Sequence, residues 1–453
     1  MAKRLSPESV IQFVRFSVAL TLCWPLRSNS SKNRVYCYKV LQFAHAVNTT
    51  IIMSIALHSA YLHLSDFVNV SRIIAVSLGM GQMIITTLIC ISKHESLQYI
   101  IEDMEAYMRE AQQYEREVFY KYIAKGHKFY GSCIILMYTT STIFLLGPTV
   151  LPISLPLDIE YPFPVNSTAL YVTLYLHQTV ITYQCTALLC LGGFGALMLW
   201  YTTARFECLA IEFQKSSNVD TMVVCIKKQL LLMRMSQKSW SNRLRNKSIC
   251  KNWCELLLVN RFGKCEVHLA FGVAYNPTEY CSSGFSYAEN VATTIRFIAF
   301  GAVAGSTGIL ILCGMIMILL QAPIAETPLE QVFLAYSLTN FDDPIYLQNS
   351  SVIVKVQFIG VIMTVLTEVY MYTWPADHMK DTSENLSRSA YDITWYKQSV
   401  RMQKDILNIL VYQKPVVISI RCVMPELTLE YFCSYLSNAF SIFASMRTLL
   451  MNN

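Results

Sequence analysis

Charge is the first thing that this chain has little of. Asp, Glu, Lys and Arg together make up only 15% of its 453 residues, whereas hydrophobic residues make up 54%. Soluble domains typically carry about 25% charged residues. The composition therefore excludes an ordinary soluble protein of this length and favours a chain that crosses a membrane several times.

Positive charge is missing altogether from three connecting segments, 65–71, 154–170 and 321–350. Of the 36 Lys and Arg, 32 lie in segments 1–39, 92–130, 202–290 and 373–426. Basic loops stay in the cytosol. The pattern therefore predicts a cytosolic N-terminus, an extracellular C-terminus and an odd number of spans. It also accounts for the net charge of +6 without a nucleic-acid partner.

Cysteine is missing from the same three segments. Most of the 15 Cys lie in apolar stretches or basic loops, where a reducing cytosol keeps thiols free, so we expect no structural disulfide. The group Cys250, Cys254, Cys265, His268 and Cys281 does not have the spacing of a zinc site, and no metal is predicted.

The sequence also lacks the motifs of catalysis. There is no Gly-rich phosphate loop, no HExxH and no Ser or Cys nucleophile in a recognisable setting. We therefore predict that the chain is not an enzyme, that it has no catalytic residues and that it needs no cofactor.

The N-terminal segment 1–39 contains an apolar run, 10–26, after Lys3 and Arg4. A signal peptide begins in the same way, but Arg15 interrupts this run and no small-residue cleavage site follows it. The segment instead predicts an amphipathic helix that lies on the inner leaflet of the membrane.

Long apolar runs are what the sequence has in abundance. A span needs about 20 mostly apolar residues. Seven runs qualify, and they predict an all-α, polytopic membrane domain over 40–449, with spans at 40–64, 72–91, 131–153, 171–201, 291–320, 352–372 and 427–449. Between the second and third spans, charges of alternating sign predict a helix over Lys93–Lys128 that continues out of the membrane.

The outer halves of four predicted spans combine apolar residues with a few hydroxyl and amide groups. A small, mostly apolar ligand requires such walls, although polar residues also pack helices together. Spacings of three or four residues put each group on one helical face. The predicted ligand contacts are Ile73, Val76, Ser77, Met80, Tyr138, Thr142, Leu146, Tyr175, Gln178, Thr179, Thr182, Val352, Lys355, Val356 and Ile359. Two interpretations of Lys355 stay open: it snorkels outward, or it pairs with a ligand oxygen.

The last span carries a stripe of hydroxyl groups. Ser434, Ser437, Ser441, Ser445 and Thr448 recur every three or four residues. Such a stripe can line a water-filled lumen that several copies of the helix complete. The alternative is that each hydroxyl bonds back to its own helix.

The C-terminal quarter resembles the insect odorant receptor family. The matching elements in 373–419 are Trp374-Pro375, Ala390-Tyr391, Trp395-Tyr396 and Gln413-Lys414-Pro415, and 425–450 resembles the family's terminal pore helix. The Tyr and Thr often found in the middle of that helix are here Phe440 and Ser441.

The resemblance implies an odorant-binding subunit of a ligand-gated, non-selective cation channel in the plasma membrane of the olfactory neuron dendrite. Four subunits would surround one pore, and a shared co-receptor would complete the heterotetramer. The odorant would be a small volatile or apolar molecule, held in the outer halves of the second, third, fourth and sixth spans. The family's pore positions fall on Ser441, Ser445, Thr448 and Leu449. Ser445 stands where an apolar β-branched gate is usual, so we expect no gating by this subunit alone.

Two further interpretations remain open. A gustatory-type receptor channel shares this topology, and a G-protein-coupled receptor shares the span count with the opposite orientation. The segment 238–284 departs from the family pattern because it is Cys-rich, basic and aperiodic. We interpret it as an insertion in the loop before the fifth span, and we favour a translated intron as its origin.

Overall fold

A computed structural model describes residues 5–64, 67–149, 154–157, 159–215, 225, 287–319, 344–392, 395–397, 399–400, 403, 415–420 and 424–451. The described chain is almost entirely helical. Its helices are α1 (Pro7–Ser17), α2 (Lys32–Leu62), α3 (Phe67–Ser92), α4 (His94–Glu110), α5 (Gln113–Leu145), α6 (Thr168–Leu189), α7 (Leu191–Lys215), α11 (Tyr287–Leu319), α13 (Pro344–Tyr391) and α15 (Leu429–Met451). Short 3-10 turns occupy Ala19–Thr21, Gly147–Thr149 and Trp395–Lys397, and β1 (Ser419–Ile420) pairs antiparallel with β2 (Met424–Glu426).

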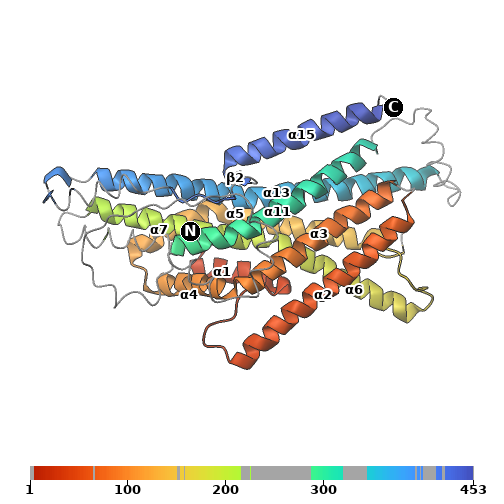
Figure 1. Cartoon of the computed structure of the whole chain (residues 1–453), viewed down its shortest axis with the longest axis horizontal. Helices are drawn as coiled ribbons and strands as arrows, with labels where there is room; N and C mark the ends of the chain where they lie inside the picture. Colours follow the sequence, from red (N-terminus) through yellow and green to blue (C-terminus); the bar gives the residue numbers. More distant parts are fainter. Residues whose placement is uncertain are drawn as a thin grey trace, which may run out of the picture.

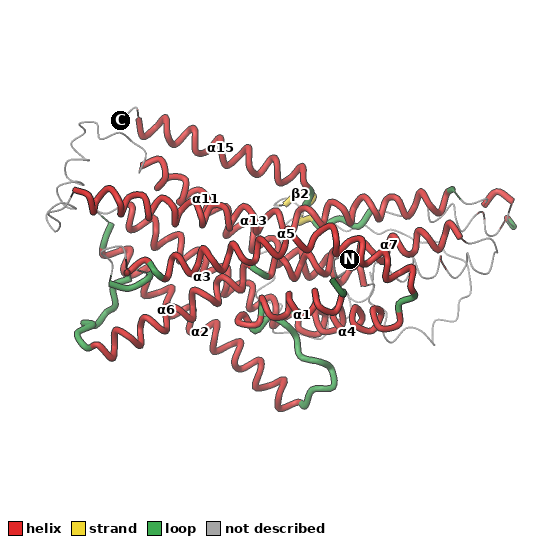
Figure 2. Tube along the Cα trace, turned by 180° about the vertical axis from the view of Figure 1, so that it is seen from behind, coloured by secondary structure: helices red, strands yellow, loops and turns green. Residues whose placement is uncertain are grey.

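The long helices form an elongated bundle. The junction of α2 and α3, the end of α11 and the start of α13 lie at one end of it, whereas α4, α7 and the second half of α13 extend toward the other end (Figures 1 and 2). Helix α15 leaves the small β-hairpin near the middle and leans away from the bundle. The C-terminus therefore lies at the same end as the α2–α3 junction, as expected when the seventh span runs in the same direction as the first.

Five described helical segments are long and apolar enough to cross a membrane: 32–62, 70–92, 168–215, 290–317 and 355–386. These cover most of five of the seven predicted spans. The third and seventh predicted spans lie mostly in α5 and α15, and the third continues into the 3-10 turn Gly147–Thr149. Neither α5 nor α15 contains a described stretch of 18 residues that is as apolar as those in the five segments.

Two helix boundaries differ from the predictions. The predicted helix 93–128 is interrupted at Ala111 and Gln112, where Glu115 accepts hydrogen bonds from the Gln112 backbone N–H at 2.7 Å and from the Tyr107 hydroxyl. Burial raises the pKa of Tyr107, which therefore keeps the proton that it donates. The predicted fourth span is divided at Cys190 into α6 and α7.

Helices α7 and α13 pack closely because small residues of α7 meet large residues of α13. A Cβ added at Gly195 would lie only 2.6 Å from Cε1 of Tyr372, whose side chain is fully buried. Glycine at this position is what allows the tyrosine ring to lie against the α7 backbone. The same α13 continues past the predicted end of the sixth span with Pro375 inside it, so the segment predicted as a loop from 373 is helical as far as Tyr391.

Helix α1 begins where the Ser6 side chain accepts a hydrogen bond from the Ser9 backbone N–H at 3.2 Å. Ile11 and Val14 are buried in the main hydrophobic core, whereas Phe16 on another face is 81% exposed. The predicted amphipathic helix is thus present over 7–17. It packs on the bundle through one face and exposes aromatic surface on another. The segment 238–284 lies outside the described residues, so its interpretation as an insertion stays a prediction.

Candidate ligand-binding site

The first part of the site is an apolar cluster between α2, α3 and α6. Of the predicted ligand contacts, Ile73 and Met80 are each only 1% exposed and belong to this cluster, and Val76 packs against it. The other buried members are Ile52, Ala56, Ala60, Leu157, Ile159 and Ile181. Helical spacing accounts for the alignment of the α3 residues, since positions 73, 76 and 80 fall on one face.

The loop before α6, which contains Leu157 and Ile159, covers this cluster and is held there by Gln178 of α6. The side chain of Gln178 makes two hydrogen bonds to the loop. Its Oε1 accepts a hydrogen bond from the Leu157 backbone N–H at 2.9 Å, and its Nε2 donates to the Tyr161 hydroxyl at 3.1 Å. Gln178 is completely buried. The sequence pointed to Gln178 but not to Leu157 and Ile159, which lie in a Pro-rich loop without helical periodicity. The loop therefore supplies part of the apolar wall, and Gln178 holds it in place.

Most hydroxyl groups predicted to face a ligand already have a partner in the protein. Ser77, Thr142 and Thr179 each donate to the carbonyl oxygen four residues earlier, at 2.8 Å. Tyr175 donates to the Leu145 carbonyl at 2.9 Å. Tyr138 donates to the Ser17 carbonyl, also at 2.9 Å, and so links α5 to the N-terminal segment.

Thr182 differs from these residues. Its Oγ1 is buried, yet it has no hydrogen-bond partner among the described residues. Thr182 follows Ile181 of the apolar cluster and lies one turn after Gln178. A buried hydroxyl without a partner is costly, and a ligand oxygen would satisfy it.

The structure does not bring every predicted contact into the cluster. Leu146, Val356 and Ile359 are each about half exposed, between 49% and 52%, and Lys355 is partly buried. Val352 lies in α13, but its side chain lies outside the described part of the chain. The cluster thus brings together predicted ligand contacts of α3 and α6. The contribution of the α13 residues to the ligand site stays a prediction.

A buried carboxylate that sequence reasoning missed joins three of the helices. Glu368 of α13 is 1% exposed; its Oε1 accepts from Gln82 Nε2 of α3, and its Oε2 accepts from Ser306 Oγ of α11, both at 2.7 Å. Acidic residues inside spans are rare and mark positions of importance. Glu368 is the only acidic residue in the predicted sixth span, and that was the available signal.

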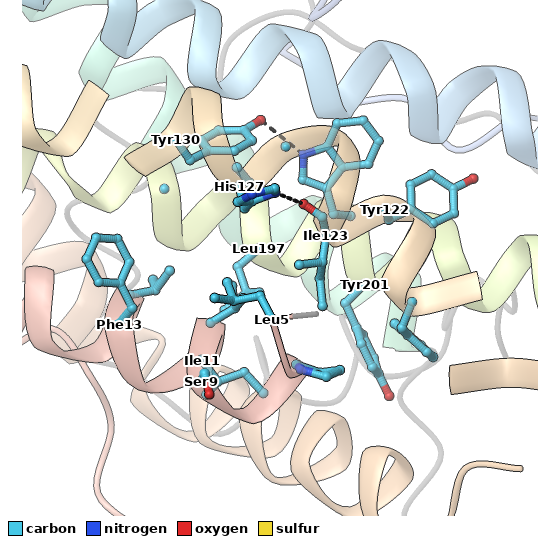
Figure 3. A pocket seen from close by; sticks show the side chains of 18 of the residues that line it. Leu5, Ser9, Ile11, Phe13, Tyr122, Ile123, His127, Tyr130, Leu197 and Tyr201 are labelled. Carbon is cyan, nitrogen blue, oxygen red and sulfur yellow. Dashed lines mark hydrogen bonds between the residues drawn. The ribbon is translucent and has the colours of Figure 1, made fainter. Parts of the chain in front are cut away.

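A separate cavity of about 460 Å³ lies beneath α1, between α4, α5 and α7 (Figure 3). Its walls are mostly apolar and include Phe13, Ile134 and Leu197. None of the predicted ligand contacts lines it. Sequence reasoning missed this cavity, because it arises where an N-terminal helix packs on α4, α5 and α7, which lie far later in the sequence.

Helix α15 presents its hydroxyl stripe away from the protein. Ser441, Ser445 and Thr448 are exposed, whereas Tyr435 and Ala439 are buried. Ser445 donates to the Ser441 carbonyl and Thr448 to the Ala444 carbonyl, each at 2.9 Å. The hydroxyls therefore bond back to the helix and face outward at the same time. The Leu449 side chain lies outside the described residues.

Among the described residues, no group of three or more His, Cys, Asp or Glu could hold a metal ion.

These features define a class: a polytopic helical membrane protein whose terminal helix presents a hydroxyl stripe outward. Residues 329–440 match the family model described as 7tm odorant receptor. The solved structure of the olfactory receptor OR5 from Machilis hrabei in complex with eugenol matches at a TM-score of 0.63 and 12% identity, over 98% of this chain and 99% of that chain. A second solved structure of OR5 from Machilis hrabei also matches at a TM-score of 0.63 and 12% identity, over 98% of both chains. No curated protein sequence matches the chain. The C-terminal part of the chain is thus similar to the odorant receptor family, and the chain as a whole shares its fold with OR5.

Proposed function

We propose that the chain is the odorant-binding subunit of a ligand-gated, non-selective cation channel that assembles with a shared co-receptor. Its place would be the plasma membrane of the olfactory neuron dendrite, with the N-terminus in the cytosol. The ligand would be a small, mostly apolar odorant that reaches the cluster between α3 and α6.

The observation that carries this proposal is the buried, unpartnered hydroxyl of Thr182 beside an apolar cluster. Eugenol, which OR5 binds, is a small molecule of this mixed character. An odorant with one oxygen would gain binding free energy from burial of its apolar surface, about 25 cal/mol per Å² removed from water. It would also gain from the one hydrogen bond that the protein leaves unmade.

The exposed hydroxyl stripe of α15 supports the channel half of the proposal. Ser441, Ser445 and Thr448 face away from the single chain, and exposed hydroxyls on a terminal helix are suited to line water once subunits assemble.

The ligand site is tested by co-expression with the co-receptor and recording of current across an odorant panel. The variants Ser77→Phe and Thr142→Trp each add an aromatic ring to a predicted wall. We expect each to lower sensitivity roughly tenfold or more with unchanged surface expression, since overpacking or filling costs about 1–3 kcal/mol. Unchanged sensitivity in both variants would place the odorant elsewhere and leave these residues as helix packing.

A further inference from the structure

The cavity beneath α1 is distinct from the proposed odorant site. It lies between the N-terminal helix and the first halves of α5 and α7, and none of the predicted odorant contacts lines it. Its volume of about 460 Å³ falls in the range of about 300–1,000 Å³ that is typical of sites for small ligands.

The mouth of the cavity lies beside exposed apolar side chains, which we expect to contact lipid. Leu5 and Phe13 line it and are each 46% exposed. On α5, Gly131 lines it, and Ile135, one turn later on the same face, is 66% exposed. Gly131 is also the first residue of the predicted third span, so the mouth of the cavity lies at the level where the bilayer begins.

The polar atoms in the walls are mostly engaged with the protein. The Tyr130 hydroxyl accepts from Trp200 Nε1 at 3.0 Å, and His127 Nδ1 lies 3.0 Å from the Ile123 carbonyl oxygen (Figure 3). The Tyr122 hydroxyl donates to Glu207. The exception is Tyr201, whose hydroxyl is buried without a partner among the described residues. These walls offer much apolar area and few free hydrogen-bonding groups, which suits a hydrocarbon chain.

Helix α1 carries positive charge. Arg15 is exposed near the end of the helix, and Lys3 and Arg4 precede Leu5 in the sequence. Basic residues beside an apolar surface attract the anionic lipids of the cytosolic leaflet. We propose that this cavity binds one acyl chain of an anionic phospholipid from the cytosolic leaflet, with its headgroup held near Arg15 of α1.

Gly131 offers a way to fill the cavity without disturbing the fold. A Cβ added at Gly131 meets no atom within 4 Å. Replacing glycine inside a helix also removes its entropic disadvantage. The variant Gly131→Leu should therefore fold normally and occupy the space of the acyl chain. The matched control is Ser132→Leu, because Ser132 is the next residue of α5, is exposed and does not line the cavity.

The test uses the full chain reconstituted in phosphatidylcholine vesicles that contain a phosphatidylserine with a photoreactive acyl chain. Irradiation should label peptides 5–14 and 123–134, and Gly131→Leu should reduce this labelling at least fivefold, whereas Ser132→Leu should leave it unchanged. Tyr201→Phe should also leave it unchanged, because a hydrocarbon chain has no need of the hydroxyl. Melting curves of the purified variants confirm that each is folded.

Five results would overturn the proposal. Absence of label from both peptides would mean that no lipid enters, and equal labelling of Gly131→Leu would place the lipid on the outer surface of the bundle. Displacement of the label by an activating odorant, or its loss in Tyr201→Phe, would make the cavity a site for an oxygenated ligand. Displacement by oleate but not by unlabelled phosphatidylserine would assign the cavity to a free fatty acid. Because labelling reports binding and not current, this test is independent of the proposed channel function.

Discussion

At the scale of single residues, the buried polar groups of the helical bundle differ in whether they have a hydrogen-bond partner. Glu368 has a partner for each oxygen, in Gln82 and Ser306, whereas the Thr182 hydroxyl has none among the described residues. A satisfied group joins helices, and an unsatisfied one is available to a ligand. The two residues therefore give opposite predictions.

Replacing Glu368 should destabilise the bundle according to what replaces it. In Glu368→Ala, Gln82 and Ser306 lose their acceptor, at a cost of about 1–3 kcal/mol for each orphaned group. Glu368→Gln keeps a planar side chain that can pair with both and should be much milder. Thermal unfolding of detergent-purified protein, followed by size exclusion, measures the difference. Equal melting temperatures for the two variants would show that the hydrogen bonds do not hold these helices together.

Thr182→Val should change ligand preference without harming the fold, since it removes a hydroxyl that bonds to nothing in the protein. For an activating odorant with a hydroxyl group, we expect a loss of sensitivity of about threefold to thirtyfold, as the loss of one hydrogen bond implies. Its methyl ether should be affected much less. The matched control is Thr179→Val, whose hydroxyl already donates to the Tyr175 carbonyl. Equal losses in the two variants, or equal losses for alcohol and ether, would contradict a role for the Thr182 hydroxyl in binding.

At the scale of elements, hydropathy alone predicted the helices that cross the bundle, because a span must be long and apolar wherever it packs. The breaks at Ala111 and Cys190 could not be predicted in this way. The break at Ala111 accompanies the local hydrogen bond from Gln112 to Glu115, and the break at Cys190 has no signal in hydropathy because it lies within one long apolar run. The α3 and α6 walls of the site followed from helical spacing, but the covering loop at Leu157 and the partner of Glu368 required the fold.

The contact of α7 with α13 predicts that Gly195 tolerates no larger side chain. Gly195→Ala would place a methyl group 2.6 Å from the fully buried Tyr372 ring, which has no room to move. Overpacking of this kind costs about 1–3 kcal/mol. We expect a lower melting temperature and less protein at the cell surface, whereas Gly131→Ala, with open space at its Cβ, should equal the parent chain. A Gly195→Ala variant as stable as Gly131→Ala would mean that the two helices can separate at little cost.

At the scale of the whole molecule, charge and fold together predict the orientation in the membrane. The C-terminus lies at the end of the bundle where α2 meets α3 (Figure 1), and the connections at that end carry no Lys or Arg. A tag after Asn453 should therefore be labelled on intact cells, and a tag before Met1 should be labelled only after permeabilisation. The reverse pattern would contradict the charge argument for orientation.

Dependence on a partner subunit is the central claim about function, and whole-cell current measures it most directly. The hydroxyl of Ser445 stands at the predicted gate, so this chain should not close and open a pore by itself. Cells that express the chain alone, the co-receptor alone or both are exposed to one odorant panel. The account predicts odorant-evoked, non-selective cation current only in the cells that express both. Robust odorant-evoked current from the chain alone, or none from the pair when both reach the surface, would contradict it.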